Sequence, residues 1–181
     1  MRFIMENTKL GSMEKEAEKL VPKCINVVSA KRLPESIRKM IASALVALKI
    51  EMIADKIPEL NIPVNLIVFD EDLQNAFDLG DDGIAACSKI AYCPIKNLEL
   101  FEDEYLAMAA ILEELCHLIW DIADETIVKL KVLYKIRNIR KETTLEDIYG
   151  RCNPEELKES YRSIPVEKRS SLPYRLPTDY D

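Results

Sequence analysis

The chain has 181 residues, 48% hydrophobic and 31% charged, which is enough for one domain with a sizeable core. No run of about 18 uncharged apolar residues occurs, so the sequence predicts no membrane-spanning helix. Its five cysteines include no Cys-x-x-Cys pair and favour reduced thiols in a cytoplasmic protein. The net charge of −7 is uneven, because residues 70–125 carry 2 basic and 15 acidic side chains. This middle section favours a solvated acidic face, with bound cations or a basic ligand as the alternative, and disfavours nucleic acid as a partner.

The ends of the chain differ in composition from its centre. The sequence GSM at residues 11–13 is typical of a cloning junction, so we expect residues 1–12 to be a vector-derived leader. Residues 13–150 are expected to form the main domain. Residues 151–181 are expected to be a partly flexible C-terminal extension that ends in the proline-punctuated sequence SSLPYRLPTDYD.

The first half of the main domain alternates between helix and strand signals. Apolar residues recur every three or four positions over residues 34–57, which predicts a long amphipathic helix ended by Pro58. The β-branched run at 62–70 predicts a buried strand. A short helix or loop is expected at 70–79, and a strand or tight hairpin at 84–95.

The second half is predicted to be helical. A central helix is expected over residues 103–124 and a further helix over about 125–140. A short helix near 154–161 has Asn153 as its expected cap. The segment from residue 129 to 141 has six basic residues and no acidic one, which on a helix is typical of a solvated face.

The central helix carries the residues that indicate chemistry. An apolar run leads into Glu113 and Glu114, and His117 is the only histidine of the chain. Residues four apart share a helix face, so Glu113, His117 and Asp121 follow one another along one edge. A buried carboxylate without a partner costs several kcal/mol or becomes protonated, and a divalent cation is one way to satisfy this pair. The alternative is that these side chains simply face water.

The sequence EELCH at residues 113–117 resembles the H-E-x-x-H motif of zincin metallopeptidases. In zincins the motif helix follows a long helix and a small mixed sheet, whose edge strand lines the substrate cleft. The predicted elements over residues 34–125 follow a similar order. The resemblance implies an α+β fold with a zincin-like core, comprising a long N-terminal helix, a small mixed sheet, the central motif helix and C-terminal helices.

The resemblance also assigns roles to single residues. Glu114 matches the general base, and His117 matches the second zinc histidine. Glu113 stands where the first histidine is expected, and exchanging nitrogen for oxygen alters the affinity and charge of a zinc site. The third ligand of zincins comes from further along the chain, and Asp121 and Asp124 are the candidates here.

Other details of the site stay open. Glu125 is a further candidate for the third ligand, and Asp121 could instead orient His117. The continuation H-x-x-G-x-x-[HD] is absent. Stabilisation of the oxyanion would need another group, and the candidates are Tyr92, Tyr134 and Tyr149.

The resemblance implies a zincin-like, zinc-dependent hydrolase in which the metal lowers the pKa of its water and Glu114 accepts the proton. Its substrate would be a peptide or protein. The alternative function is a catalytically inactive zincin-fold protein that acts as a protein-binding or regulatory module.

Two further patterns are weaker. The sequence E-x-x-H also occurs on the di-iron helices of ferritin-like bundles, but that fold needs a second such motif. Cys87, Cys93 and Cys116 with His117 would make a Cys₃His zinc site of unusual spacing, and buried thiols are the plainer interpretation. Cys116 and His117 are adjacent on a helix and point apart, which disfavours a nucleophile and base pair.

Overall fold

The computed structural model describes residues 6–7, 21–29, 32–57, 63–69, 89–94, 101, 103–150 and 153–177. The strands of this part are β1 (Glu6–Asn7), β2 (Ile25–Ser29), β3 (Val64–Phe69) and β4 (Lys89–Pro94). Its helices are α2 (Glu35–Ala54), α5 (Glu104–Trp120), α6 (Glu125–Arg137), α7 (Leu145–Tyr149), α8 (Pro154–Ser163) and α9 (Val166–Ser170). The predicted mixture of helices with a small sheet is confirmed.

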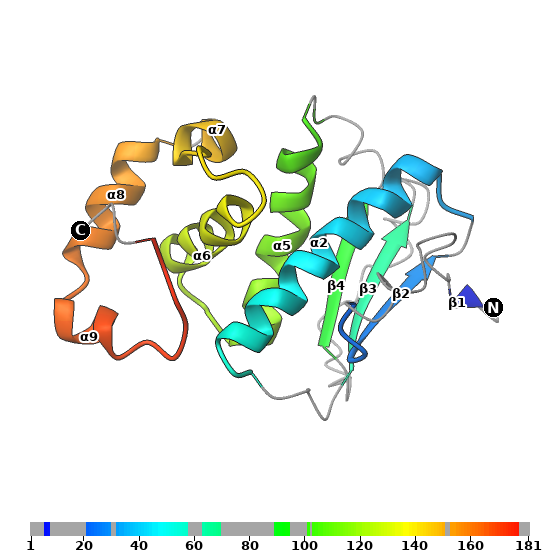
Figure 1. Cartoon of the computed structure of the whole chain (residues 1–181), viewed down its shortest axis with the longest axis horizontal. Helices are drawn as coiled ribbons and strands as arrows, with labels where there is room; N and C mark the ends of the chain where they lie inside the picture. Colours follow the sequence, from blue (N-terminus) through cyan, green and yellow to red (C-terminus); the bar gives the residue numbers. More distant parts are fainter. Residues whose placement is uncertain are drawn as a thin grey trace, which may run out of the picture.

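The sheet has the order β1-β2-β3-β4, and its three longer strands are parallel (Figure 1). Parallel neighbours need a crossover connection, and α2 supplies it between β2 and β3. Val64, Leu66 and Val68 are at most 1% exposed, as expected of a parallel strand covered by helices. The short strand β1 pairs antiparallel with the end of β2, so part of the expected leader takes part in the sheet.

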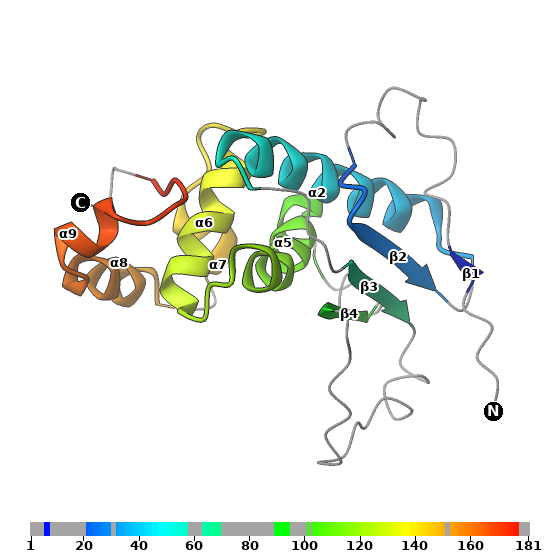
Figure 2. The same cartoon turned by 90° about the horizontal axis from the view of Figure 1, so that it is seen from below.

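Helices α2 and α5 connect the sheet at one end of the molecule to the remaining helices at the other (Figures 1 and 2). The two helices pack against each other, and α5 also packs against β4. Leu45 and Leu48 of α2, with Leu112 and Leu115 of α5, are completely buried. This contact forms the centre of the hydrophobic core.

Helix α6 is surrounded by the protein. Its apolar residues point in every direction, and eight of its 13 residues are buried. Lys131 and Lys135 are 0% exposed. The prediction of a solvated basic face on this helix is therefore wrong for these two lysines.

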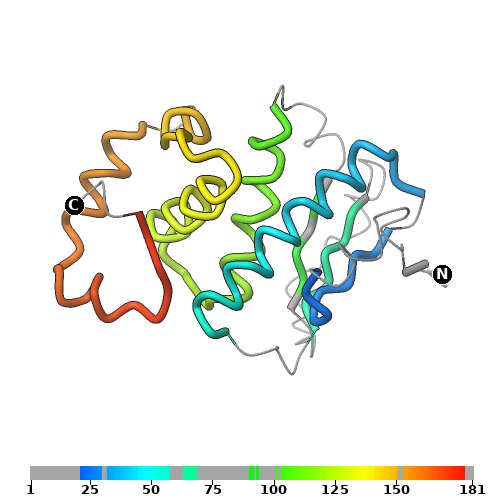
Figure 3. The backbone as a smooth tube through the Cα atoms, in the orientation of Figure 1, coloured from blue at the N-terminus to red at the C-terminus, as the bar shows by residue number. Residues whose placement is uncertain are grey.

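The C-terminal residues pack onto α6 and continue into an extended segment. Figure 3 shows the backbone passing through α7, α8 and α9 before it turns back toward α2. Residues 172–177 are neither helix nor strand. The element predicted at 70–79 and residues 84–88 of the next one lie outside the described residues. No described helix has the length and apolar character needed to cross a membrane.

Candidate functional site

Helix α5 presents the motif in the middle of the molecule. Its first turn is capped by Asp103, whose carboxylate accepts a hydrogen bond of 2.7 Å from the backbone N–H of Tyr105. The Glu113 and His117 side chains are 22% and 24% exposed, and Glu114 on the neighbouring face is exposed. The motif therefore lies at the boundary between core and solvent.

The imidazole of His117 is held in one orientation. Its Nδ1 lies 2.6 Å from the carbonyl oxygen of Ile122. A carbonyl only accepts, so Nδ1 carries the proton and donates it. Nε2 faces the carboxylate of Glu125 at the start of α6, with 3.4 Å between Nε2 and Oε1. Metal-binding histidines are commonly oriented in this way through the nitrogen that does not bind the metal.

The ammonium group of Lys129 connects the two helices at this point. Its Nζ lies 3.2 Å from Glu113 Oε1 and 3.0 Å from Glu125 Oε2. The Lys129 side chain is 15% exposed. Burial opposes its charge, but hydrogen bonds and charge interactions with Glu125 and Glu113 outweigh burial and raise the pKa of Lys129. Glu113 and Glu125 thus share a positive charge that the chain itself supplies, and His117 lies beside Glu125.

The predicted third ligands have roles in the backbone between α5 and α6. Asp121 ends α5 in the left-handed region, with φ of 54°, a conformation that Asp tolerates better than most residues. Asp124 caps α6, and its carboxylate accepts a 3.0 Å hydrogen bond from the N–H of Ile127. Both residues are exposed.

The four predicted metal ligands Glu113, His117, Asp121 and Asp124 all lie within the described residues. No group of three or more His, Cys, Asp and Glu in this part of the chain is arranged to hold a metal ion. The side chains as they stand do not fit the implied zinc ion, because the Lys129 ammonium occupies the place between Glu113 and Glu125.

The remaining candidates are dispersed. The pKa of the Cys93 thiol on β4 is raised to about 12, mainly by burial. The negative charge of Glu114 contributes to this shift, so Glu114 lies close enough to β4 to act on Cys93. Tyr149 is buried, and its ring centroid lies 5.8 Å from Lys129 Nζ. Tyr134 is half-buried beside Lys131. The side chain of Tyr92 lies outside the described set. Cys24, Cys93 and Cys116 are buried free thiols.

A second cluster lies on the opposite face of α6 and was not predicted. Lys131 Nζ donates to Glu51 Oε2 at 3.0 Å and to the carboxylate of Asp55, and both acidic side chains are only 1% exposed. Burial opposes ionisation of Asp55, but bonds from Lys131 and Trp120 outweigh it and lower the pKa of Asp55. Arg175 completes the cluster from the C-terminal segment.

Lys135, one turn after Lys131, lacks such partners. Its Nζ lies 3.9 Å from the centroid of the Trp120 ring and finds no hydrogen-bond partner among the described residues. Burial lowers the pKa of Lys135, the interaction with the Cys116 thiol partly opposes this, and the neighbouring charge of Lys131 lowers the pKa further. Cys116, which is also completely buried, has a raised pKa for the same primary reason.

The chain was compared with family models, curated proteins and solved structures, and none of them matches it.

Proposed function

We propose that this chain is a zincin-like domain without metal-dependent catalysis that acts as a protein-binding module. The observation that carries the proposal is the position of the Lys129 ammonium between Glu113 and Glu125. A zinc ion at this point would require both carboxylates and Nε2 of His117. The lysine satisfies the carboxylates without a metal, so no activated water is available for Glu114 to deprotonate.

Two features support the zincin-like part of the proposal. Helix α2, strands β3 and β4 and helix α5 follow one another in the order expected of a zincin core, and α5 packs against both α2 and β4. The Nδ1 of His117 donates to a carbonyl while Nε2 faces a carboxylate, an orientation suited to metal binding. These features support a relationship to zincins in which a lysine lies at the place of the metal.

The binding part of the proposal rests on β4. This strand is the last in the order of the described strands, and it lies beside the motif helix α5. The edge of a sheet offers backbone N–H and C=O groups to which an extended peptide can add as a further strand. In zincins the edge strand beside the motif helix lines the substrate cleft. The expected partner is therefore an extended segment of another protein.

A zinc titration tests the proposed role of Lys129. The wild-type chain is expected to purify without stoichiometric zinc and to bind none tightly, whereas Lys129→Met is expected to bind about one zinc per chain. Lys158→Met is the matched control. Lys158 is 16% exposed and bridges Glu146 and Glu155 at 2.8 and 2.7 Å, so it repeats the carboxylate–ammonium arrangement in a different part of the chain.

Three results would contradict the proposal. About one zinc in the wild-type protein that is lost in Glu113→Gln would favour a metal-dependent hydrolase. Peptide hydrolysis that disappears in Glu114→Gln would do the same. Failure of Lys129→Met to bind zinc, with folding intact by circular dichroism, would mean that the three side chains do not form a latent metal site.

Hydrogen exchange tests the proposed surface. Extended peptides selected from a random library against the full chain are expected to protect the backbone amides of β4 from exchange. Selected peptides that bind tightly but leave β4 unprotected would show that the strand edge is not the binding surface.

A further inference from the structure

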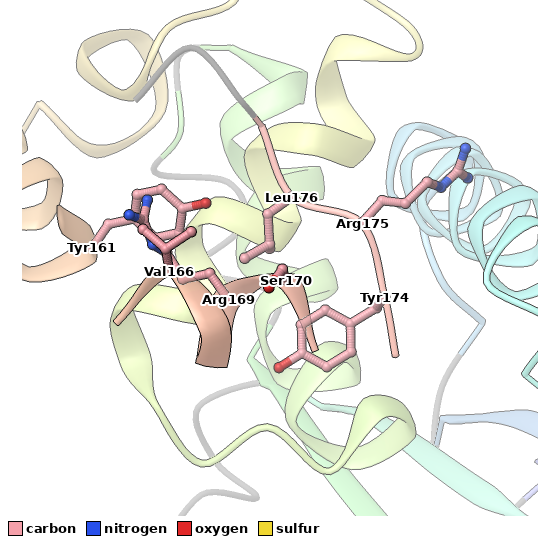
Figure 4. Close-up of a pocket in the computed structure, with 7 residues that line it drawn as sticks. All are labelled: Tyr161, Val166, Arg169, Ser170, Tyr174, Arg175 and Leu176. Atoms are coloured by element: carbon pink, nitrogen blue, oxygen red, sulfur yellow. The ribbon is translucent and has the colours of Figure 1, made fainter. Parts of the chain in front are cut away.

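The segment after α9 places one arginine on the buried acidic pair of α2. Residues 171–177 have the sequence SLPYRLP and run from α9 toward α2. In Figure 4 the Arg175 side chain extends away from the other labelled residues and toward α2. It ends at Glu51 and Asp55, which lie more than a hundred residues earlier in the sequence.

Arg175 is contacted through its side chain and through its main chain. Nη2 lies 3.1 Å from Glu51 Oε1, and Nε lies 3.3 Å from Asp55 Oδ1. The backbone N–H of Arg175 donates to the same carboxylate of Asp55 at 3.3 Å, and its carbonyl accepts from Lys131 Nζ at 3.0 Å. The guanidinium carbon lies 5.3 Å from the centroid of the Tyr134 ring. A site that binds a peptide through an arginine makes these same kinds of contact.

The acceptors of this site are fixed independently of Arg175. Glu51 also accepts from Asn138 at 2.9 Å, and Asp55 accepts from Trp120 Nε1 at 2.9 Å. Both carboxylates are 1% exposed, whereas the Arg175 side chain is 48% exposed. The arginine therefore approaches a rigid, buried pair of acids from the solvent side. Without it, two carboxylates and one ammonium would carry a net charge of −1, which favours another cation.

The segment that carries Arg175 also borders open space. A pocket of about 560 Å³ separates it from α8 and α9 (Figure 4). Its lining residues are Tyr161, Val166, Arg169, Ser170, Tyr174, Arg175 and Leu176. Leu172, Tyr174 and Leu176 of the segment pack against the hydrophobic core, whereas the pocket leaves the side of the segment that faces α8 and α9 open.

We propose that Glu51, Asp55 and Lys131 form a recognition site for an arginine within an extended peptide of a partner protein. Residues 171–177 occupy this site in the chain itself and compete with the partner. The required ligand has an arginine, free backbone N–H and C=O groups on that residue, and an extended backbone such as flanking prolines favour. The site lies on the opposite face of α6 from Lys129, so this inference does not rest on the proposed function of the motif.

Fluorescence anisotropy with a labelled peptide tests the inference. The probe is acetyl-Leu-Pro-Tyr-Arg-Leu-Pro-amide, which copies residues 172–177, and the receptor is the full chain. Arg175→Ala is expected to bind the probe at least about tenfold more tightly than the wild-type chain, whose own segment competes at high effective concentration. A probe with citrulline in place of arginine is expected to bind at least about tenfold more weakly to the same variant, because it lacks the charge.

Arg140→Ala is the matched control. Arg140 is 51% exposed, lies 3.2 Å from Asp103 and has its guanidinium 5.5 Å from the Tyr105 ring, but its acidic partner is 42% exposed. This variant is expected to bind the probe as weakly as the wild-type chain. Should Arg175→Ala be too unstable to titrate, hydrogen exchange of residues 171–177 in the wild-type chain replaces it. Saturating probe is expected to increase their exchange, and the citrulline probe to leave it unchanged.

The inference is overturned by any of three results. If Arg175→Ala binds the probe no more tightly than the wild-type chain, residues 171–177 do not occupy a peptide-binding site. Equal affinity for the arginine and citrulline probes would exclude recognition of the guanidinium. A dimer that requires Arg175 would identify the segment of a second copy, and not a separate partner, as the occupant. None of these results depends on zinc or on Lys129, so each would contradict this inference without contradicting the proposed function.

Discussion

Replacing Lys131 with methionine is expected to lower the free energy of unfolding by about 3 kcal/mol. Lys131 is completely buried and donates hydrogen bonds to Glu51, Asp55 and the carbonyl of Arg175. Methionine fills a similar volume and leaves little cavity, so the cost comes from the two carboxylates that lose their main cation. Removing one partner of a buried ion pair costs about 3–5 kcal/mol, and the half-exposed Arg175 places this case at the low end.

The same substitution at Lys135 is the control, and its expected sign is different. Lys135 is equally buried, but its Nζ has no hydrogen-bond partner among the described residues. Lys135→Met removes a buried amine and leaves no buried carboxylate without its cation. The substitution is therefore expected to be neutral or to stabilise the protein by about 1 kcal/mol. Comparing the same Lys→Met substitution at these two positions, one helical turn apart, thus separates the effect of losing an ion-pair partner from the effect of burial.

Urea unfolding followed by circular dichroism measures both variants. With a slope of about 2 kcal/mol per molar urea, Lys131→Met is expected to lower the midpoint by about 1.5 M. Fluorescence of Trp120 is a poor substitute, because both lysines lie over its ring and their loss changes the signal of the folded state. Similar midpoints for the two variants would refute the reasoning, since burial alone would then decide the cost.

Three other predictions concern residues on or beside these helices. Burial lowers the folded-state pKa of Lys135 below its usual 10.5, so the unfolded state holds this proton more strongly and stability rises with pH between the two pKa values. The stability advantage of Lys135→Met over the wild type is therefore expected to shrink from about pH 7 to about pH 10, and a constant difference in urea unfolding would contradict this. Burial raises the pKa of Cys93 to about 12 and also raises that of Cys116, so native protein is expected to resist iodoacetamide at both thiols until urea unfolds it, as peptide mass mapping would reveal. Asp124→Ala is expected to cost about 1 kcal/mol while Asp124→Asn retains most of the stability, because both Asp and Asn cap helices; equal losses in urea unfolding would assign Asp124 another role.

Much of the fold could be predicted because its signals are local. Helices α2, α5, α6 and α8 begin within one residue of their predicted starts, where Pro34, Asp103, Asp124 and Asn153 lie just before the first turns. Strand β2 was missed because INVVS is only five residues long and its residue types do not follow its alternating burial, since Val28 is half-buried and Ser29 is buried. Helices α7 and α9 have five residues each, too few to show a helical period.

Less of the candidate site could be predicted from the sequence, because the side chains that meet there come from separate helices and their spacing does not show which of them pair. The spacing of Glu113 and His117 predicted that they share one edge of α5; His117 contacts Glu125, and Lys129 connects Glu113 to Glu125. Nothing in the spacing indicates that Lys129 joins them. The buried pair of Lys131 and Glu51 is separated by 80 residues, so only the fold brings it together. One local signal did exist, since apolar residues surround Lys131 on every face of α6.

The position of α6 also accounts for part of the charge asymmetry of the chain. The acidic section at residues 70–125 indicated either a solvated face or bound cations, and Glu113 and Glu125 belong to that section. Their cation is Lys129, from the first turns of α6. Two residues later the helix has rotated by roughly 200°, which directs Lys131 to the acids of α2. One helix thus supplies positive charges to acidic groups on both of its neighbours. A metal ion at the motif would have to displace the Lys129 ammonium from both Glu113 and Glu125, and this is the physical reason to expect the motif to remain without metal.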